Sequence, residues 1–190
     1  MANTLNTRSG ALLDLDDPDP AAIKLDDIAG SLAMVPRFGA QTKVFYSVAQ
    51  HAVSVALTAE RLGRPELALA ALHHDSHEAF ICDLPTPVKA YTGCKYQELA
   101  DRLDRAIEEA FGIKLKTKES SDGKFTKEID NAILVVEAER LLAGEPPERD
   151  VRSEVLSAAR ATMAEMPEAW APPDGAAHFE EAHHRIAAAT

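Results

Sequence analysis

One short segment gathers most of the side chains that could do chemistry. It reads His73-His74-Asp75-Ser76-His77-Glu78, and five of these six side chains can bind a metal ion or a proton. The apolar residues around it follow a helical period, which predicts a helix over residues 66–80. Polar groups inside such a helix cost free energy unless they are paired or coordinated. The segment therefore indicates a functional site rather than a solvated helix face.

Two more polar residues occupy positions that should be buried. His51 lies on the apolar stripe of a predicted helix over residues 44–62, and Asp130 lies on that of a predicted helix over residues 125–143. Taken singly, such a histidine is more often a satisfied core residue, and an acid near a helix start is more often a cap. Three inward polar sites on three helices of one small domain are explained together by a single cation.

The residue types at these positions suit one divalent transition metal. Two imidazoles and two carboxylates form a donor set for Co²⁺, Mn²⁺, Zn²⁺, Fe²⁺ or Ni²⁺, and they leave positions open on a six-coordinate ion, as a catalytic site needs. An alternative pair remains, because His73 and His77 are four residues apart, a spacing that lets two imidazoles share one metal. The four candidate ligands are His51, His74, Asp75 and Asp130.

The order of these residues resembles the H…HD…D signature of the HD phosphohydrolase superfamily. The likeness is closest to bacterial and phage 5′-deoxynucleotidase-like members, and it covers roughly residues 8–142. A lone His-Asp doublet is a weak signal, but the doublet followed by Glu78 and then by the motif of residues 83–89 is a strong one. The resembling stretches are Arg37-Phe38-Gly39, Phe45-Tyr46-Ser47-Val48-Ala49-Gln50-His51, His74-Asp75-x-x-Glu78 and Asp83-Leu84-Pro85-Thr86-Pro87-Val88-Lys89.

The resemblance implies a role for each matching residue. The metal ligands that it implies are His51, His74, Asp75 and Asp130. Glu78 and Asp83 would be the acid/base and water-positioning carboxylates beside the metal. Arg37 and Lys89 would hold the phosphate, and Phe38 would lie near the nucleoside. The arginine suits this role on physical grounds, because its fork of donors matches phosphate oxygens.

The resemblance further implies a metal-dependent phosphohydrolase whose substrate is a small-molecule deoxynucleotide, and the cysteine usage described below favours a cytoplasmic protein. Release of phosphate from deoxynucleoside 5′-monophosphates is the first expectation. A dNTP triphosphohydrolase of the same fold is the alternative enzyme, and a nucleotide-binding regulatory protein without turnover is the alternative outside enzymes. A homodimer is a further expectation from the resemblance.

The elements that must position these residues are almost all helices, so the expected fold is an all-α HD-domain bundle of a single domain. Residues 1–25 form an irregular segment with a possible strand at 11–15, residues 26–143 the catalytic core, and residues 144–190 the C-terminal helices. Two polar loops are predicted, at 83–89 and 120–124. A solvated helix face is predicted for Glu180, Glu181, His183 and His184. The predicted helices cover residues 26–34, 44–62, 66–80, 96–111, 125–143, 148–166 and 176–189.

Composition excludes several classes of protein. Hydrophobic residues make up 46% of the chain and charged residues 27%, which excludes disorder along its whole length. The net charge of −11 argues against nucleic-acid binding, which depends on lysine and arginine. The apolar runs are shorter than the roughly 18 residues of a membrane span, and the polar start predicts no secretory signal. Cys82 and Cys94, the two cysteines, are expected to be reduced and incidental, as in a cytosolic protein.

Overall fold

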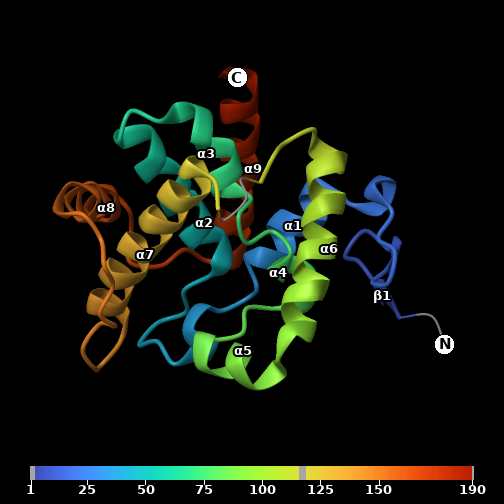
Figure 1. The fold of residues 1–190 in the computed structure, drawn as a ribbon, viewed down its shortest axis with the longest axis horizontal. Coiled ribbons are helices and arrows are strands. Elements are labelled where there is room, and N and C mark those ends of the chain that lie inside the picture. Colours follow the sequence, from blue (N-terminus) through green and yellow to red (C-terminus); the bar gives the residue numbers. More distant parts are fainter. Residues whose placement is uncertain (1–2, 116–118, 190) are drawn as a thin grey trace.

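The computed structural model describes residues 3–115 and 119–189, and in these ranges the fold is all-α apart from one small hairpin (Figure 1). In the hairpin, β1 (Thr4–Asn6) pairs antiparallel with β2 (Leu12–Asp14), which confirms the strand expected near residues 11–15. A 3₁₀ turn, η1 (Pro20–Ala22), leads into the first α-helix. The predicted fold class is therefore confirmed.

Helix α2 is the centre of the bundle and packs against α3, α7, α8 and α9. Its residues are mostly small, and nearly all of them are buried, so neighbouring helices approach it from several sides. Helices α7 and α8 lie toward one side of the view in Figure 1, and α6 with the hairpin lies toward the other. The bounds are α1 Leu25–Leu32, η2 Arg37–Ala40, α2 Val48–Arg61, α3 Pro65–Leu72, α4 Glu78–Ile81, α5 Thr86–Thr92, α6 Cys94–Phe111, α7 Ser121–Leu141, α8 Ser153–Glu165 and α9 Pro172–Ala189.

The continuous helix predicted over residues 66–80 is wrong. Helix α3 ends at Leu72, a turn follows, and α4 begins at Glu78. The backbone N–H of Ser76 donates to the carbonyl of His73, and the hydroxyl of Ser76 is hydrogen-bonded to Nδ1 of the same histidine. These local bonds compete with helical ones, as short polar side chains commonly do. The segment of histidine and acidic residues, 73–77, is thus a turn between two helices.

The two predicted polar loops are also wrong in part, and capping explains both. Pro87 occupies the first turn of α5, where a missing N–H breaks no helical bond, so the Thr-Pro-Val-Lys stretch begins a helix instead of excluding one. Ser120 caps α7 by accepting a hydrogen bond from the N–H of Gly123, so the helix begins at Ser121. Ser47 caps α2 in the same way, and that helix begins later than the apolar pattern predicts.

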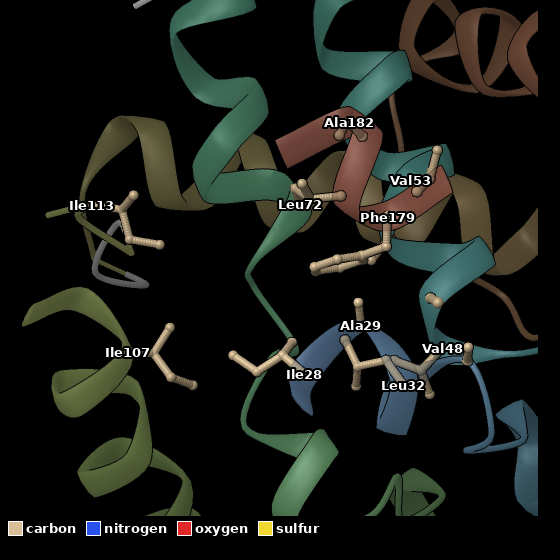
Figure 2. Close-up of a cluster of buried hydrophobic side chains, with 14 of the residues drawn as sticks. Ile28, Ala29, Leu32, Val48, Val53, Leu72, Ile107, Ile113, Phe179 and Ala182 are labelled. Atoms are coloured by element: carbon tan, nitrogen blue, oxygen red, sulfur yellow. The ribbon is translucent and has the colours of Figure 1, made fainter. Parts of the chain in front are cut away.

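Two clusters of buried apolar side chains hold the bundle together, and α2 contributes to both. The first lies between α1, α2, α3, α6 and α9 and includes Ile28, Leu72 and Phe179 (Figure 2). The second lies between α2, α3, α7 and α8 and includes Val55 and Ile133. Each fully buried side chain of this size contributes about 1.5–3 kcal/mol. The shared helix α2 thereby holds His51 in a fixed position between the clusters.

The described helices include none with both the length and the apolar character that crossing a membrane requires.

Candidate metal centre

His51 is fully buried on α2, and its ring is held from one side. Nδ1 donates a hydrogen bond to Oε1 of Glu137 at 2.8 Å, since a carboxylate can only accept. The other nitrogen, Nε2, lies 3.2 Å from Oδ1 of Asp130 and 3.8 Å from Oδ2 of Asp75, yet it makes no hydrogen bond to any residue of the described ranges. The imidazole therefore presents a free nitrogen toward two carboxylates.

His74 presents its ring to the same carboxylates from the turn after α3. Its Nδ1 donates to the carbonyl of Ala71 at 2.7 Å. Its Nε2 lies 3.1 Å from Oδ2 of Asp75 and 3.8 Å from Oδ1 of Asp130, and again makes no hydrogen bond. The centroids of the His51 and His74 rings are 5.3 Å apart. The four predicted ligands are thus brought together from three elements that are distant in sequence.

This arrangement fits a metal ion. One ligand atom each from His51, His74 and Asp130 lie within 4.8 Å of one another, so these buried groups can hold a cation. Both imidazoles have their second nitrogen fixed by an oxygen acceptor, which is the usual way in which ligating histidines are oriented. Among the described residues neither Nε2 atom has a hydrogen-bond partner, and leaving buried polar atoms without partners is costly.

The electrostatics of the cluster keep its carboxylates charged. Burial alone would raise the pKa of Asp130, but the adjacent rings of His51 and His74 hold that pKa well below its usual range. Burial alone would lower the pKa of His74, but the carboxylates of Asp75 and Asp130 raise it well above its usual value. The carboxylates therefore attract a cation in place of the proton that the imidazole must lose to bind metal.

Glu137 links the candidate metal ligands to the guanidinium of Arg37. This fully buried carboxylate accepts from His51 with Oε1 and from the guanidinium of Arg37 with Oε2, the latter at 3.1 Å. Through the first of these contacts, Glu137 supports a candidate metal ligand. Glu137 lies seven residues after Asp130 on the same face of α7, which is the sequence signal for its place beside the metal ligands.

Arg37 belongs to the same cluster and does not cap the preceding helix. It is buried, its NH1 lies 4.0 Å from Oδ2 of Asp75, and its Nε has no hydrogen-bond partner. Phe38 follows it with a positive φ of 55° and places its ring 5.5 Å from the guanidinium carbon. The ring is half-buried and packs against the second apolar cluster.

Glu78, Asp83 and Lys89 form a group beside Asp75. Nζ of Lys89 donates to Oε1 of Glu78 at 3.1 Å and lies 3.8 Å from Oδ1 of Asp83. Oε2 of Glu78 is buried without a hydrogen bond. Burial, and then the charges of Asp75 and Asp83, raise the pKa of Glu78 well above its usual value, although Lys89 opposes them. A carboxyl group with a raised pKa can carry a proton near neutral pH.

The alternative histidine pair does not form. His73 turns away from the cluster, with Nε2 hydrogen-bonded to Nδ1 of His183 at 2.8 Å and Nδ1 to Ser76. His77 donates from Nδ1 to Oδ1 of Asp104 on α6 at 2.9 Å, and it lies near Asp75 and Glu78. The solvated face predicted for His183 is also wrong, because this residue is half-buried against His73.

Comparison with known proteins supplies relatives without assigned activities. No protein-family model matches the chain. It is 44% identical over 111 residues to an uncharacterized protein of Rhodobacter capsulatus, which is 55% of this chain and 56% of that protein. It is 36% identical over 109 residues to the uncharacterized protein YfdR of Escherichia coli, which is 57% of this chain and 58% of that protein. The chain thus spans little more than half the length of these curated relatives.

Proposed function

We propose that this protein is a metal-dependent phosphohydrolase that releases phosphate from deoxynucleoside 5′-monophosphates. The observation that carries the proposal is the convergence of two hydrogen-bond-free imidazole nitrogens, from His51 and His74, on the carboxylates of Asp75 and Asp130. Side-chain cations border this cluster, and a carboxyl group with a raised pKa adjoins it. That combination suits hydrolysis of a phosphate ester.

His51, His74, Asp75 and Asp130 would hold the divalent ion, with Co²⁺, Mn²⁺, Zn²⁺, Fe²⁺ and Ni²⁺ as candidates. When bound, such an ion supplies a Lewis acid that polarises phosphoryl oxygens and lowers the pKa of a water ligand from about 15.7 towards about 7. The two aspartates balance the charge of the ion. Binding of the phosphate dianion therefore depends on the cations of the protein.

Arg37 and Lys89 would bind the phosphate. Phosphoryl transfer depends mainly on positioning and on stabilising negative charge, so fixed cations are what the reaction needs from the protein. Arg37 is fixed by Glu137, and its Nε remains free to donate. Lys89 approaches from α5 beside Glu78 and Asp83, and its ammonium group is only partly exposed.

Glu78 would move the proton. Its Oε2 has no hydrogen-bond partner within the part of the chain that the structure describes, so this atom could accept a proton from the attacking water. The same atom can then deliver the proton to the departing 5′ oxygen of the nucleoside. Asp83, across Lys89, would position the water and keep Lys89 oriented.

The test is to incubate the full chain with each candidate metal and with separate nucleotides, and to identify the products. We expect inorganic phosphate and deoxynucleoside from dAMP, dGMP, dCMP and dTMP. Glu78→Gln should lower the rate by roughly 10²- to 10⁴-fold, whereas the exposed control Glu168→Gln should not. Release of triphosphate from dATP without hydrolysis of monophosphates would assign the other enzymatic activity. Absence of turnover with every metal would contradict the proposal.

A further inference from the structure

A cavity of about 640 Å³ adjoins the proposed phosphate site. It lies between the N-terminal hairpin, α1, the segment before α2 and the link from α4 to α5. Asp83 lines it and lies 3.8 Å from the ammonium group of Lys89, so the cavity begins where the phosphate would be held. Its size is that of a small-molecule site. Its lining includes Arg8, Met34, Pro36, Ala40, Cys82 and Asp83.

The walls of this cavity contain strained backbone. Phe38, Gly39 and Ala40, of which the last two line the cavity, have consecutive positive φ angles of 55°, 58° and 62°. Cys82, which also lines the cavity, has φ 65° and ψ 158°, a conformation that is nearly reserved for glycine. Strain of this kind persists where the surrounding structure requires a particular shape, and it concentrates at binding sites. Two such segments facing one cavity indicate that its shape serves a ligand.

Arg8 is an exposed residue that lines the cavity, and its side chain lies against α1. Ser9, the next residue, donates from its backbone N–H and its hydroxyl to the carboxylate of Asp27 and so fixes this part of the hairpin on α1. The guanidinium lies against Gly30 of α1, where an added Cβ would come within 2.9 Å of its central carbon. Among the described residues, this guanidinium has neither a hydrogen-bond acceptor nor an ion-pair partner.

The lining favours a flat, uncharged group with hydrogen-bond acceptors. Met34 and Pro36 supply apolar surface on which a ring can pack, and Met34 is 58% exposed. The carboxylate of Asp83 disfavours a second anion in the cavity. The fork of Arg8 matches two adjacent acceptors, and O6 with N7 of guanine is the base edge that arginine binds most often. Adenine presents an amino donor at the same position, which cannot accept from arginine.

We propose that this cavity takes the base of the nucleotide and that Arg8 makes the protein select a 6-oxopurine base, guanine, over adenine. The inference rests on the proposed function insofar as it assumes that the bound molecule is a nucleotide. Gly30 contributes to this selectivity, because the absence of a side chain leaves the space in which the guanidinium of Arg8 lies.

The test compares dGMP with dAMP in the full chain loaded with Mn²⁺. We expect kcat/KM to favour dGMP by roughly 5- to 150-fold, which is the discrimination expected of one bidentate arginine contact. Arg8→Met removes the donors, and Gly30→Ala displaces the guanidinium without substituting any residue of the cavity lining. Both substitutions should bring the ratio close to one. Gly30→Ala lies in a helix interior, where alanine is favoured over glycine, so it should fold. Arg105→Met, an exposed position on α6, is the matched control and should keep the preference.

Equilibrium dialysis of dGMP and dAMP against the same variants separates this inference from the proposed function. If no nucleotide is hydrolysed but the binding ratio depends on Arg8 and Gly30, the function is wrong and the base assignment stands. If monophosphates are hydrolysed while the protein binds both purines equally, or keeps its preference in both variants, the base assignment is overturned.

Discussion

His73 and His74 are neighbours in one turn, yet they lie in two opposite environments. The ring of His74 faces the carboxylates of Asp75 and Asp130, and its Nε2 has no hydrogen bond. The ring of His73 packs between aromatic residues, with both nitrogens hydrogen-bonded. The pKa of His74 is raised well above its usual value, whereas burial, with the nearby His183, lowers that of His73 to about 3.

The difference shows that residue type alone does not decide which histidine can bind a ligand. The deciding property is the set of atoms that faces the ring nitrogens. His73 uses both nitrogens to connect the turn to Ser76 and to α9, and this makes it structural. His74 uses one nitrogen on a backbone carbonyl and leaves the other free. Substitutions on the two sides of the turn should therefore have separable effects.

The largest effect on metal binding and activity is expected from Asp75→Asn, which changes one of the carboxylates that His74 faces. The substitution keeps the size of the side chain but removes a charge that attracts the cation. Metal binding and phosphate release should be lost together, with kcat/KM falling on the order of 10³-fold or more. Metal content per chain, measured on dialysed protein, and phosphate release check this. Turnover that survives loss of the metal would contradict the mechanism.

A smaller effect is expected from Glu137→Gln, which keeps the shape of the residue that orients His51. Substituting residues that orient metal ligands typically costs 10- to 100-fold in metal affinity, and we expect a loss in that range. Competition with a fluorescent chelator measures it. Glu139→Gln on the same helix pairs with Arg160 at the surface and should leave the affinity unchanged. Equal affinity in both variants would mean that Glu137 does not orient His51.

His73, whose ring packs between aromatic residues, should make the free energy of unfolding depend on pH in the acidic range. Because the folded pKa of His73, about 3, lies below its ordinary value of 6.5, the unfolded chain binds the extra proton between these values. Stability from this residue is therefore present above pH 6.5 and lost as the pH falls, by about 2 kcal/mol at pH 5. His74 has a raised pKa and contributes with the opposite sign.

Urea unfolding at pH 7.5 and pH 5 in EDTA checks this expectation. His73→Leu removes the group whose pKa is lowered, so the variant should lose less stability on acidification than the parent by about 2 kcal/mol. An identical loss in both proteins would show that His73 does not carry the effect.

The smallest effect is expected from His183→Ala. It removes the half-buried partner of His73 and leaves Nε2 of that buried histidine unpaired, which should cost about 1 kcal/mol of unfolding free energy. Metal affinity should stay within about twofold, because the two sides of the turn have no shared partner. His184→Ala, at an exposed neighbouring position, is the control. A large change in metal affinity would show that the two environments are coupled.

Much of the fold and the set of converging residues could be predicted from the sequence. Apolar periodicity located the helices, and His51 and Asp130 stood out because a polar residue on a buried stripe needs a partner. The turn at residues 73–77 was missed because apolar residues continue on both sides of it, so periodicity does not register the break. His183 was missed because a histidine among glutamates has the composition of a solvated face. Its partner lies 110 positions away, where no local pattern points to it.

The double contact of Glu137 has a consequence for how the two halves of the site communicate. One carboxylate holds a candidate metal ligand with one oxygen and a candidate phosphate-binding guanidinium with the other. Any displacement of this carboxylate moves both partners, so filling either subsite changes the free energy of filling the other. Such coupling is reciprocal by thermodynamic necessity. Binding of the cation and binding of the anion would then be coupled through a residue that touches neither.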